Sequence, residues 1–232
     1  PISLNTVVRK ANCLNESLFR ETSSSAELRN KKIETIYPLS FPAGDFYIDN
    51  MAHSGPIRQS DIVFLGDSLT ESFRLKYHFN RDDLRNRGIS GDTTGGVIYR
   101  LGEITRAKPR KLFLMIGIND VYQGFSPGQV SSNIEKILQV LMDETPATII
   151  FLQSILPVNE DRLLIDESVN TRIYELNYEL EKLCSARKIN WIDLHSEFLN
   201  QRGQMDSKFT YDGLHLTPEG YIHWAGILLK YL

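Results

Sequence analysis

The sequence predicts an α/β fold in which helices cover both faces of a parallel sheet. From residue 61 onward, short runs rich in β-branched and aromatic residues alternate with amphipathic stretches, a pattern typical of repeated βαβ units. Three of the short runs are almost continuously apolar, as expected for strands that are buried on both faces. Motifs rich in Gly, Asp and Ser follow several of these runs, at the strand ends where parallel sheets bind their ligands.

The alternating pattern places each element in order. The expected strands are Asp61–Leu65, Leu84–Arg87, Lys111–Ile116, Thr148–Gln153 and Asn190–Asp193. The expected helices are Leu69–Phe79, Gly95–Arg106, Gly128–Asp143, Ser168–Arg187 and Pro218–Tyr231. A serine N-cap followed by proline, Ser126-Pro127, introduces the third helix. The fourth helix has apolar residues at three- and four-residue steps, which indicates one buried face: Ile173, Leu176, Leu180 and Leu183.

The organisation of the chain is expected to be one domain with an extension before it. The domain spans residues 60–232, which is long enough to bury a full hydrophobic core. Residues 1–59 contain a serine tract and a stretch punctuated by Pro and Gly, with one helix expected around Ala26 to Ile36. We interpret them as an extension that packs on the domain, and it stays open whether they shape a pocket or mediate contacts in a homodimer.

Composition and charge exclude several classes of protein. The formal net charge is −3 and no Lys/Arg cluster forms a stripe, so no nucleic-acid partner is expected. No apolar stretch approaches the roughly 20 residues that span a bilayer, so no integral membrane segment is expected. Cys13 and Cys184 form no motif, which favours two free thiols in a reducing compartment over a disulfide. A cytoplasmic location is therefore favoured, and secretion stays open because the chain starts at Pro1, so that a signal peptide could have been removed.

Four polar motifs fall at one edge of the predicted sheet. Three follow successive strands and one precedes the last helix: Gly66-Asp67-Ser68, Gly88-Ile89-Ser90-Gly91-Asp92-Thr93-Thr94, Gly117-Ile118-Asn119-Asp120 and Asp212-Gly213-Leu214-His215. Each motif alone would be an ordinary turn. Together they supply a serine nucleophile, an orienting carboxylate and a base, in the chain order Ser, Asp, His.

Ser68 is the candidate nucleophile. It follows an apolar run and Gly66-Asp67, so it lies where a buried strand stops and turns. Taken alone, a serine directly before Leu69 is more simply the N-cap of the helix that begins there. As a nucleophile, Ser68 would also aim its backbone N–H, at a helix start, toward developing negative charge. The flanking residues do not fit G-x-S-x-G, so the nucleophile elbow of the α/β-hydrolases is not indicated.

Two further residues are candidate donors to an oxyanion. A glycine at position 91 lets its backbone N–H approach a substrate oxygen without side-chain obstruction, although Gly91 could simply be a turn residue. Asn119 follows an apolar strand and could donate its side-chain amide, or it could satisfy backbone groups of a loop.

His215 is the candidate base and Asp212 the acid that orients it. In an Asp-x-x-His frame across a turn, the carboxylate can face Nδ1 and leave Nε2 free to take the serine proton. His195 is the rival, because Asp193-Leu194-His195 also pairs an acid with a histidine at a strand end. We rank His195 lower, since side chains two positions apart on a strand point the same way without facing each other.

No motif calls for a cofactor or a metal. The sequence contains no HExxH, no CxxC and no EF-hand loop, and the Asp and His residues suit a triad better. The loop around Gly91 matches neither the P-loop nor the dinucleotide-binding pattern, so a nucleotide-binding protein is a distant third interpretation.

With these motifs placed, the chain resembles the SGNH (GDSL-type) hydrolase superfamily over roughly residues 60–232. Four motif blocks of that superfamily match in order: Gly66-Asp67-Ser68-Leu69, the block with Gly91, Gly117-Ile118-Asn119-Asp120, and Asp212-Gly213-Leu214-His215. The Gly-Asp-Thr-Thr segment and the Asp-Gly-Leu-His ending are most similar to the platelet-activating-factor acetylhydrolase-like branch and its bacterial relatives.

The resemblance implies a fold, an activity and roles for the site residues. The fold would be a three-layer α/β/α sandwich with a central five-stranded parallel sheet. Ser68 would be the nucleophile, His215 the base and Asp212 its orienter, with an oxyanion hole from the backbone N–H groups of Ser68 and Gly91 and the side chain of Asn119. The activity would be that of a serine esterase on a small-molecule ester, with short acyl groups such as acetyl, on a sugar or lipid, expected first.

Two alternatives of different kinds stay open at this point. One is a lysophospholipase or thioesterase acting on longer chains, for which the long connection Leu156–Ser168 is the only candidate cover of an acyl groove. The other is a catalytically silent module of the same fold that binds a ligand such as an acetylated glycan.

Overall fold

The computed structural model describes residues 55–163 and 169–232 of the chain. Its centre is a sheet of five parallel strands in the order β2-β1-β3-β4-β5. The strands are β1 Ile62–Gly66, β2 Leu84–Gly88, β3 Lys111–Met115, β4 Ile149–Gln153 and β5 Asn190–Ile192. Each strand boundary lies within one residue of the predicted one, so the predicted α/β class and strands are confirmed.

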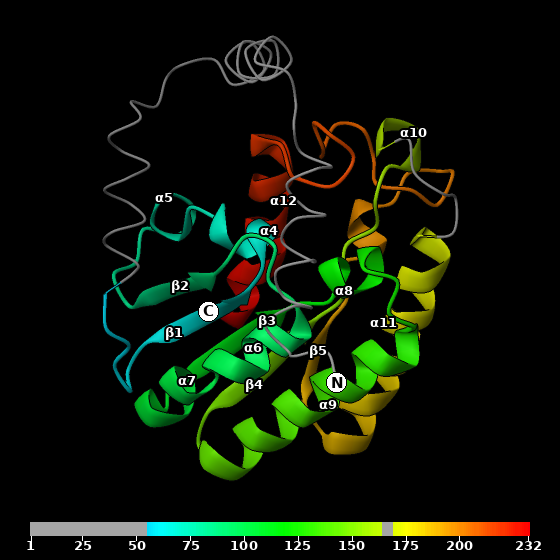
Figure 1. Ribbon diagram of the computed structural model, residues 1–232. Helices are drawn as coiled ribbons and strands as arrows, with labels where there is room; N and C mark the ends of the chain where they lie inside the picture. Colours follow the sequence, from blue (N-terminus) through cyan, green and yellow to red (C-terminus); the bar gives the residue numbers. More distant parts are fainter. Residues whose placement is uncertain (1–54, 164–168) are drawn as a thin grey trace, which may run out of the picture. The chain divides into compact units, whose positions relative to one another are not determined.

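Helices cover both faces of the sheet, which gives the three-layer α/β/α sandwich (Figure 1). The helices α6, α9 and α11 pack side by side in one layer, and α12 packs against α5 in the other. The helix bounds are α4 Ser68–Glu71, α5 Leu75–Phe79, α6 Thr94–Arg100, α7 Gly102–Ala107, α8 Ile118–Tyr122, α9 Pro127–Glu144, α10 Glu160–Leu163, α11 Val169–Arg187 and α12 Pro218–Leu228. Short 3₁₀ turns follow at Ser196–Phe198 and Leu229–Tyr231.

Residues 1–54 and 164–168 lie outside the described residues. The predicted packing of the extension, the helix expected around residues 26–36 and the state of Cys13 therefore stay predictions. Cys184 is described: it is a buried free thiol, and burial raises its pKa to about 12.

A row of stacked aromatic rings fixes one face of the sheet. Phe64, Phe113 and Phe151 occupy paired positions on neighbouring strands, and their ring centroids are 4.9 and 4.6 Å apart. Phe73 meets Phe64 edge-on and stacks on Trp224 of α12 at 4.6 Å. Because all five side chains are buried, this row joins α12 to the face of the sheet that carries Phe64.

The single helix predicted over Leu69–Phe79 is wrong, because the chain forms the two short helices α4 and α5 there. The side-chain amide of Asn86, on β2, donates to the backbone carbonyl oxygens of Thr70 and Phe73 at 2.7 and 3.1 Å. Carbonyl groups that would otherwise continue the helix are thus satisfied by a distant strand. This break follows from a tertiary contact, so local sequence periodicity could not reveal it.

Three smaller differences concern helix limits. The helix predicted over Gly95–Arg106 is divided at Leu101 into α6 and α7, next to Gly102, whose helix propensity is low. The last predicted helix ends at Leu228 and continues as a 3₁₀ turn. The short helices α8 and α10 were not predicted, since each is only about one turn long and lacks a full apolar period.

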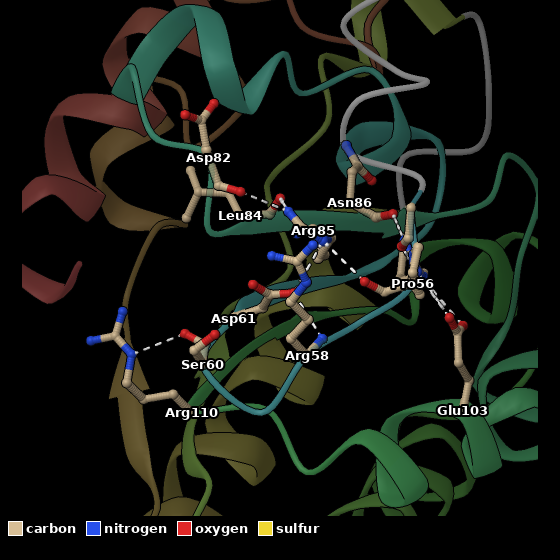
Figure 2. Close-up of polar contacts among 12 residues, drawn as sticks. Pro56, Arg58, Ser60, Asp61, Asp82, Leu84, Arg85, Asn86, Glu103 and Arg110 are labelled. Carbon is tan, nitrogen blue, oxygen red and sulfur yellow. Dashed lines mark hydrogen bonds and ion pairs between the residues drawn. The ribbon is translucent and has the colours of Figure 1, made fainter.

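A buried ion pair anchors the start of the domain to the sheet (Figure 2). Arg85, on β2, places Nε 3.1 Å from the Asp61 carboxylate, and the two side chains are only 9% and 3% exposed. The Arg85 Nη1 group donates to the carbonyl oxygens of Asp82 and Leu84, each at 2.8 Å. Asp61 also accepts from the backbone N–H of Arg58 at 2.8 Å. Both charges are therefore paired and hydrogen-bonded out of water.

Removing one member of this pair is expected to destabilise the domain strongly. Asp61→Ala leaves the Arg85 guanidinium buried without its counter-charge, which typically costs about 3–5 kcal/mol. The control is Asp161→Ala, which breaks a solvent-exposed pair with Arg202 and should cost under about 1 kcal/mol. Urea unfolding of both variants measures the difference, and equal unfolding midpoints would contradict a stabilising role for the buried pair.

Candidate active site

Ser68 lies at the carboxyl end of β1, as the first residue of α4. The N-cap of that helix is Asp67, whose Oδ1 accepts from the backbone N–H of Leu69 at 3.0 Å. Capping, the simpler role considered for Ser68, is thus performed by its neighbour. The Ser68 side chain is free of that role and half-buried.

The structure brings Ser68, His215 and Asp212 into one chain of hydrogen bonds. Ser68 Oγ lies 3.1 Å from His215 Nε2, although the two residues are 147 positions apart. On the other side of the imidazole ring, His215 Nδ1 lies 2.7 Å from Asp212 Oδ2. With the proton on Nδ1 held by the carboxylate, Nε2 is the nitrogen that can accept from the serine.

A tight turn holds the acid and the base in this arrangement. Asp212 Oδ1 accepts from the backbone N–H groups of Leu214 and His215 at 2.9 and 2.7 Å. Between them Gly213 has φ +102°, a conformation that residues with a side chain rarely adopt. Its N–H donates to Thr210 Oγ1 at 2.8 Å. The sequence Asp-x-x-His thus closes a turn in which one carboxylate serves both the backbone and the ring.

Asp212 is held as the anion. Burial opposes its ionisation, but the hydrogen bond and charge of His215 and the backbone N–H groups of Leu214 and His215 outweigh burial and lower the pKa of Asp212. The carboxylate is therefore negative at neutral pH and can stabilise a positive charge on the imidazole ring.

The rival pair does not form an acid–base unit. Asp193 Oδ1 accepts from the backbone N–H of Ser196 at 3.1 Å, and the backbone N–H of His195 donates to Ser154 Oγ at 2.7 Å. His195 Nε2 is buried, and no hydrogen-bond partner for it exists in the described part of the chain. Burial lowers the pKa of His195 despite the charge of Asp193, which favours the neutral ring. His215, not His195, is the histidine joined to Ser68.

The two candidate oxyanion donors follow the strands on either side of β1. Gly91 is in the loop after β2, and Asn119 is in α8 directly after β3. The Asn119 side-chain amide donates to the carbonyl oxygen of Asp92, next to Gly91, at 2.8 Å. Gly91 has φ +77°, and a Cβ added there would meet nothing within 4 Å. Within the protein, a glycine is favoured at position 91 by the left-handed backbone conformation and not by crowding around a Cβ. The expected reason, unobstructed approach of a substrate oxygen to the backbone N–H, would act in addition.

The second residue of the Gly-Asp-Ser motif, Asp67, has a property that sequence reasoning missed. Its side chain is 1% exposed, directly beside the serine. Burial raises the pKa of Asp67 to about 7, with a contribution from the charge of Asp92 and against the Leu69 hydrogen bond and the charge of His215. An Asp followed by Ser-Leu at a predicted helix start is an N-cap signal, which could have identified the capping role of Asp67 but not its burial.

The raised pKa of Asp67 predicts that the protein loses stability as pH rises from about 4 to about 7, because the folded state then binds a proton that the unfolded state has released. The loss from this one group is expected to be a few kcal/mol, at about 1.4 kcal/mol per pKa unit. Asp67→Asn keeps an acceptor for the Leu69 N–H but does not titrate. Urea unfolding at about pH 5 and about pH 8 should show a larger loss for the wild type than for Asp67→Asn. Equal losses in the two proteins would rule out the proposed titration of Asp67.

The described residues contain neither a candidate membrane span nor a candidate metal cluster. No helix in residues 55–163 or 169–232 has the length and apolar character needed to cross a membrane. Within the same ranges, no three or more His, Cys, Asp or Glu side chains gather in a way that would hold a metal ion.

Comparison with known proteins gives consistent matches. The model of the GDSL-like lipase/acylhydrolase family matches residues 64–222. The chain is 28% identical over 172 residues to the platelet-activating factor acetylhydrolase IB subunit alpha2 of Rattus norvegicus, covering 71% of this chain and 72% of that protein. A solved Streptococcus pneumonia protein named after platelet activating factor is 26% identical with a TM-score of 0.69, covering 91% of this chain and 99% of that one. A GDSL-like lipase from Bacteroides thetaiotaomicron VPI-5482 shares the fold at 22% identity and a TM-score of 0.68, covering 81% and 95%.

Proposed function

Because the chain belongs to the GDSL-like lipase/acylhydrolase family and is thus an acylhydrolase, we propose that it hydrolyses short-acyl carboxylic esters through an acyl-enzyme on Ser68. The observation that carries the proposal is the hydrogen-bonded chain from Ser68 Oγ through His215 to Asp212, with distances of 3.1 and 2.7 Å. A serine is a weak nucleophile unless a base takes its proton, and this geometry provides the base and its orienting acid.

The proposed reaction has two matching halves. Ser68 Oγ attacks the ester carbonyl carbon while His215 Nε2 takes the hydroxyl proton, and a tetrahedral oxyanion forms. His215 then gives that proton to the departing alcohol oxygen, leaving the acyl group on Ser68. Water repeats the sequence, with His215 as its base, and releases the carboxylic acid and the free serine.

The oxyanion is proposed to bind three N–H donors. They are the backbone N–H of Ser68, the backbone N–H of Gly91 and the side-chain amide of Asn119. These residues follow β1, β2 and β3, which are adjacent strands in one sheet. An Asn amide has two N–H groups, and the bond to Asp92 engages one of them, which leaves the second for the substrate.

Two observations support a short acyl group, with acetyl first. Several curated relatives, among them those of Rattus norvegicus and Bos taurus, are named platelet-activating factor acetylhydrolases. In addition, the described part of Leu156–Ser168, the only candidate cover of an acyl groove, lies against the turn that contains Gly213. A Cβ placed on Gly213 would lie 2.6 Å from Leu163 Cγ. Asn159, just before α10, donates its backbone N–H to Gly213 O at 2.8 Å. This segment supports the turn that carries Asp212 and His215, which favours an esterase of short acyl groups over a long-chain lipase.

The acyl preference is tested with p-nitrophenyl acetate and p-nitrophenyl octanoate. The acetyl ester is expected to have the higher kcat/KM, by about tenfold or more, because a site shaped for an acetyl group would have to fit the extra methylenes of the octanoyl chain. A higher kcat/KM for the octanoyl ester would support the long-chain alternative instead. Absence of hydrolysis of both esters by the wild type would contradict the proposed function itself.

A further inference from the structure

We propose that Arg100 is a positioning residue that holds the proposed oxyanion donors in register with the nucleophile. The inference rests on the proposed function, because it concerns the same site. Arg100 closes α6, and its side chain is 21% exposed. Its guanidinium group lies at the carboxyl end of β1 and contacts two segments, the end of β1 and the loop after β2. Each of these segments leads to one proposed donor, Ser68 or Gly91.

The guanidinium group of Arg100 bridges β1 and the loop after β2. Its Nε lies 2.8 Å from Asp92 Oδ2, and its Nη2 lies 2.7 Å from the same carboxylate. The Nη2 group also donates to the carbonyl oxygen of Gly66 at 3.0 Å. Gly66 is the last residue of β1, two positions before Ser68. A planar guanidinium with several fixed N–H groups is suited to hold a carboxylate and a carbonyl together.

Asp92 is the point at which the second and third donors meet. It directly follows Gly91, and its own carbonyl oxygen accepts from the Asn119 amide at 2.8 Å. Its backbone N–H donates to Ile89 O at 3.0 Å, which closes the loop around Gly91. A shift of Asp92 would therefore move the Gly91 N–H and the Asn119 amide together.

The loop and the strand share one anchor. The Gly66 carbonyl oxygen accepts from Arg100 and also from the backbone N–H of Ile89 at 3.1 Å. The position of the Gly91 loop is thus set relative to the strand that leads into Ser68. Without Arg100, this single hydrogen bond from the Ile89 N–H would remain between Gly66 and the loop within the described residues.

The start of α6 leaves space for the Asp92 side chain. A Cβ placed on Gly96 would lie 1.8 Å from Asp92 Oδ1, so any side chain at position 96 would displace the carboxylate. The Asp92 side chain is only 10% exposed. Two features of α6, the glycine near its start and the arginine at its end, therefore serve the same carboxylate. An incidental surface ion pair would not require this space.

Arg100→Ala is expected to lower kcat for p-nitrophenyl acetate by between about 10- and 100-fold, because small misplacement of donors costs rate in the transition state. The KM should change by less than about threefold, since Arg100 is proposed to act through the oxyanion donors and not on the substrate directly. Arg187→Ala is the matched control: it breaks an ion pair with Glu135 on α9 and α11, away from the site, and should keep the wild-type kcat. Added guanidinium at low concentration should restore part of the kcat of Arg100→Ala and leave the Arg187→Ala kcat unchanged.

Thermal unfolding and urea unfolding of each variant verify that it is folded under the assay conditions, so that loss of the fold is excluded as the cause of a lower kcat. If Arg100→Ala does not fold, Arg100→Lys replaces it, and a compact ammonium that cannot bridge both oxygens should still lower kcat by about fivefold or more. The inference is overturned if the kcat of Arg100→Ala lies within twofold of that of Arg187→Ala. It is also overturned if Arg100→Ala loses kcat and added guanidinium restores none of it. Ser68-dependent hydrolysis by the wild type tests the proposed function separately, so a normal Arg100 variant of an active enzyme would refute only the positioning role.

Discussion

Replacing Ser68 by alanine is expected to lower kcat for p-nitrophenyl acetate by about 10⁴-fold or more, because the oxygen that attacks the ester is removed. The proposed donors and the binding surface stay in place, so a small residual rate above buffer is expected. The fold should be retained, since the helix cap at this position is made by Asp67 and not by Ser68.

The control for this variant is Ser72→Ala. Ser72 is an exposed serine at the C-cap of the same helix, and its backbone, not its side chain, makes the capping bonds. It should keep the wild-type rate. Initial rates of p-nitrophenol release measure both variants, and full activity in Ser68→Ala would show that the nucleophile has been assigned wrongly.

The second large effect is expected from Asp212→Asn, which should lower kcat by about 10⁴-fold. The asparagine oxygen can still accept from the backbone N–H groups of Leu214 and His215, so the turn is kept. The amide NH₂ then faces His215 Nδ1 and forces this nitrogen to become an acceptor. The proton moves to Nε2, and the ring can no longer take the proton of Ser68.

Asp193→Asn is the matched control, because Asp193 is the acid of the rival pair and caps a backbone N–H instead of orienting the base. It is expected to keep kcat near the wild-type value. Circular dichroism of both variants verifies that the fold is intact, and kcat on p-nitrophenyl acetate separates them. The assignment of the acid would be refuted by a large loss in Asp193→Asn together with a small loss in Asp212→Asn.

Local sequence patterns were sufficient for the sheet. The three central strands, β1, β3 and β4, are short apolar runs with clear ends, and buried parallel strands have no polar face that could confuse the pattern. The polar motifs after β1, β2 and β3 could be placed at one edge of the sheet, because parallel strands all end at the same edge. The turn from Asp212 to His215 was also predictable, because its spacing is short enough to be a local property of the chain.

The features that were missed depend on contacts between distant segments. The break between α4 and α5 is made by Asn86 from another strand, and no local pattern carries that information. The buried state of Asp67 and the bridge from Arg100 to Gly66 also exist only once the sheet and its loops are assembled. His195 also resembles a catalytic histidine in sequence; strand geometry ranked it below His215, and Ser68 is hydrogen-bonded to His215.

The most direct test of the proposed mechanism is to label the wild type with a fluorophosphonate and identify the modified residue by mass spectrometry. A serine activated by His215 should displace fluoride and form one stable phosphonate ester, on the peptide that contains Ser68. Esterase activity on p-nitrophenyl acetate should fall in proportion to the labelled fraction, and Ser68→Ala should stay unlabelled. Labelling of a different residue, or full esterase activity in protein that is completely labelled at Ser68, would contradict the assignment of Ser68 as the nucleophile.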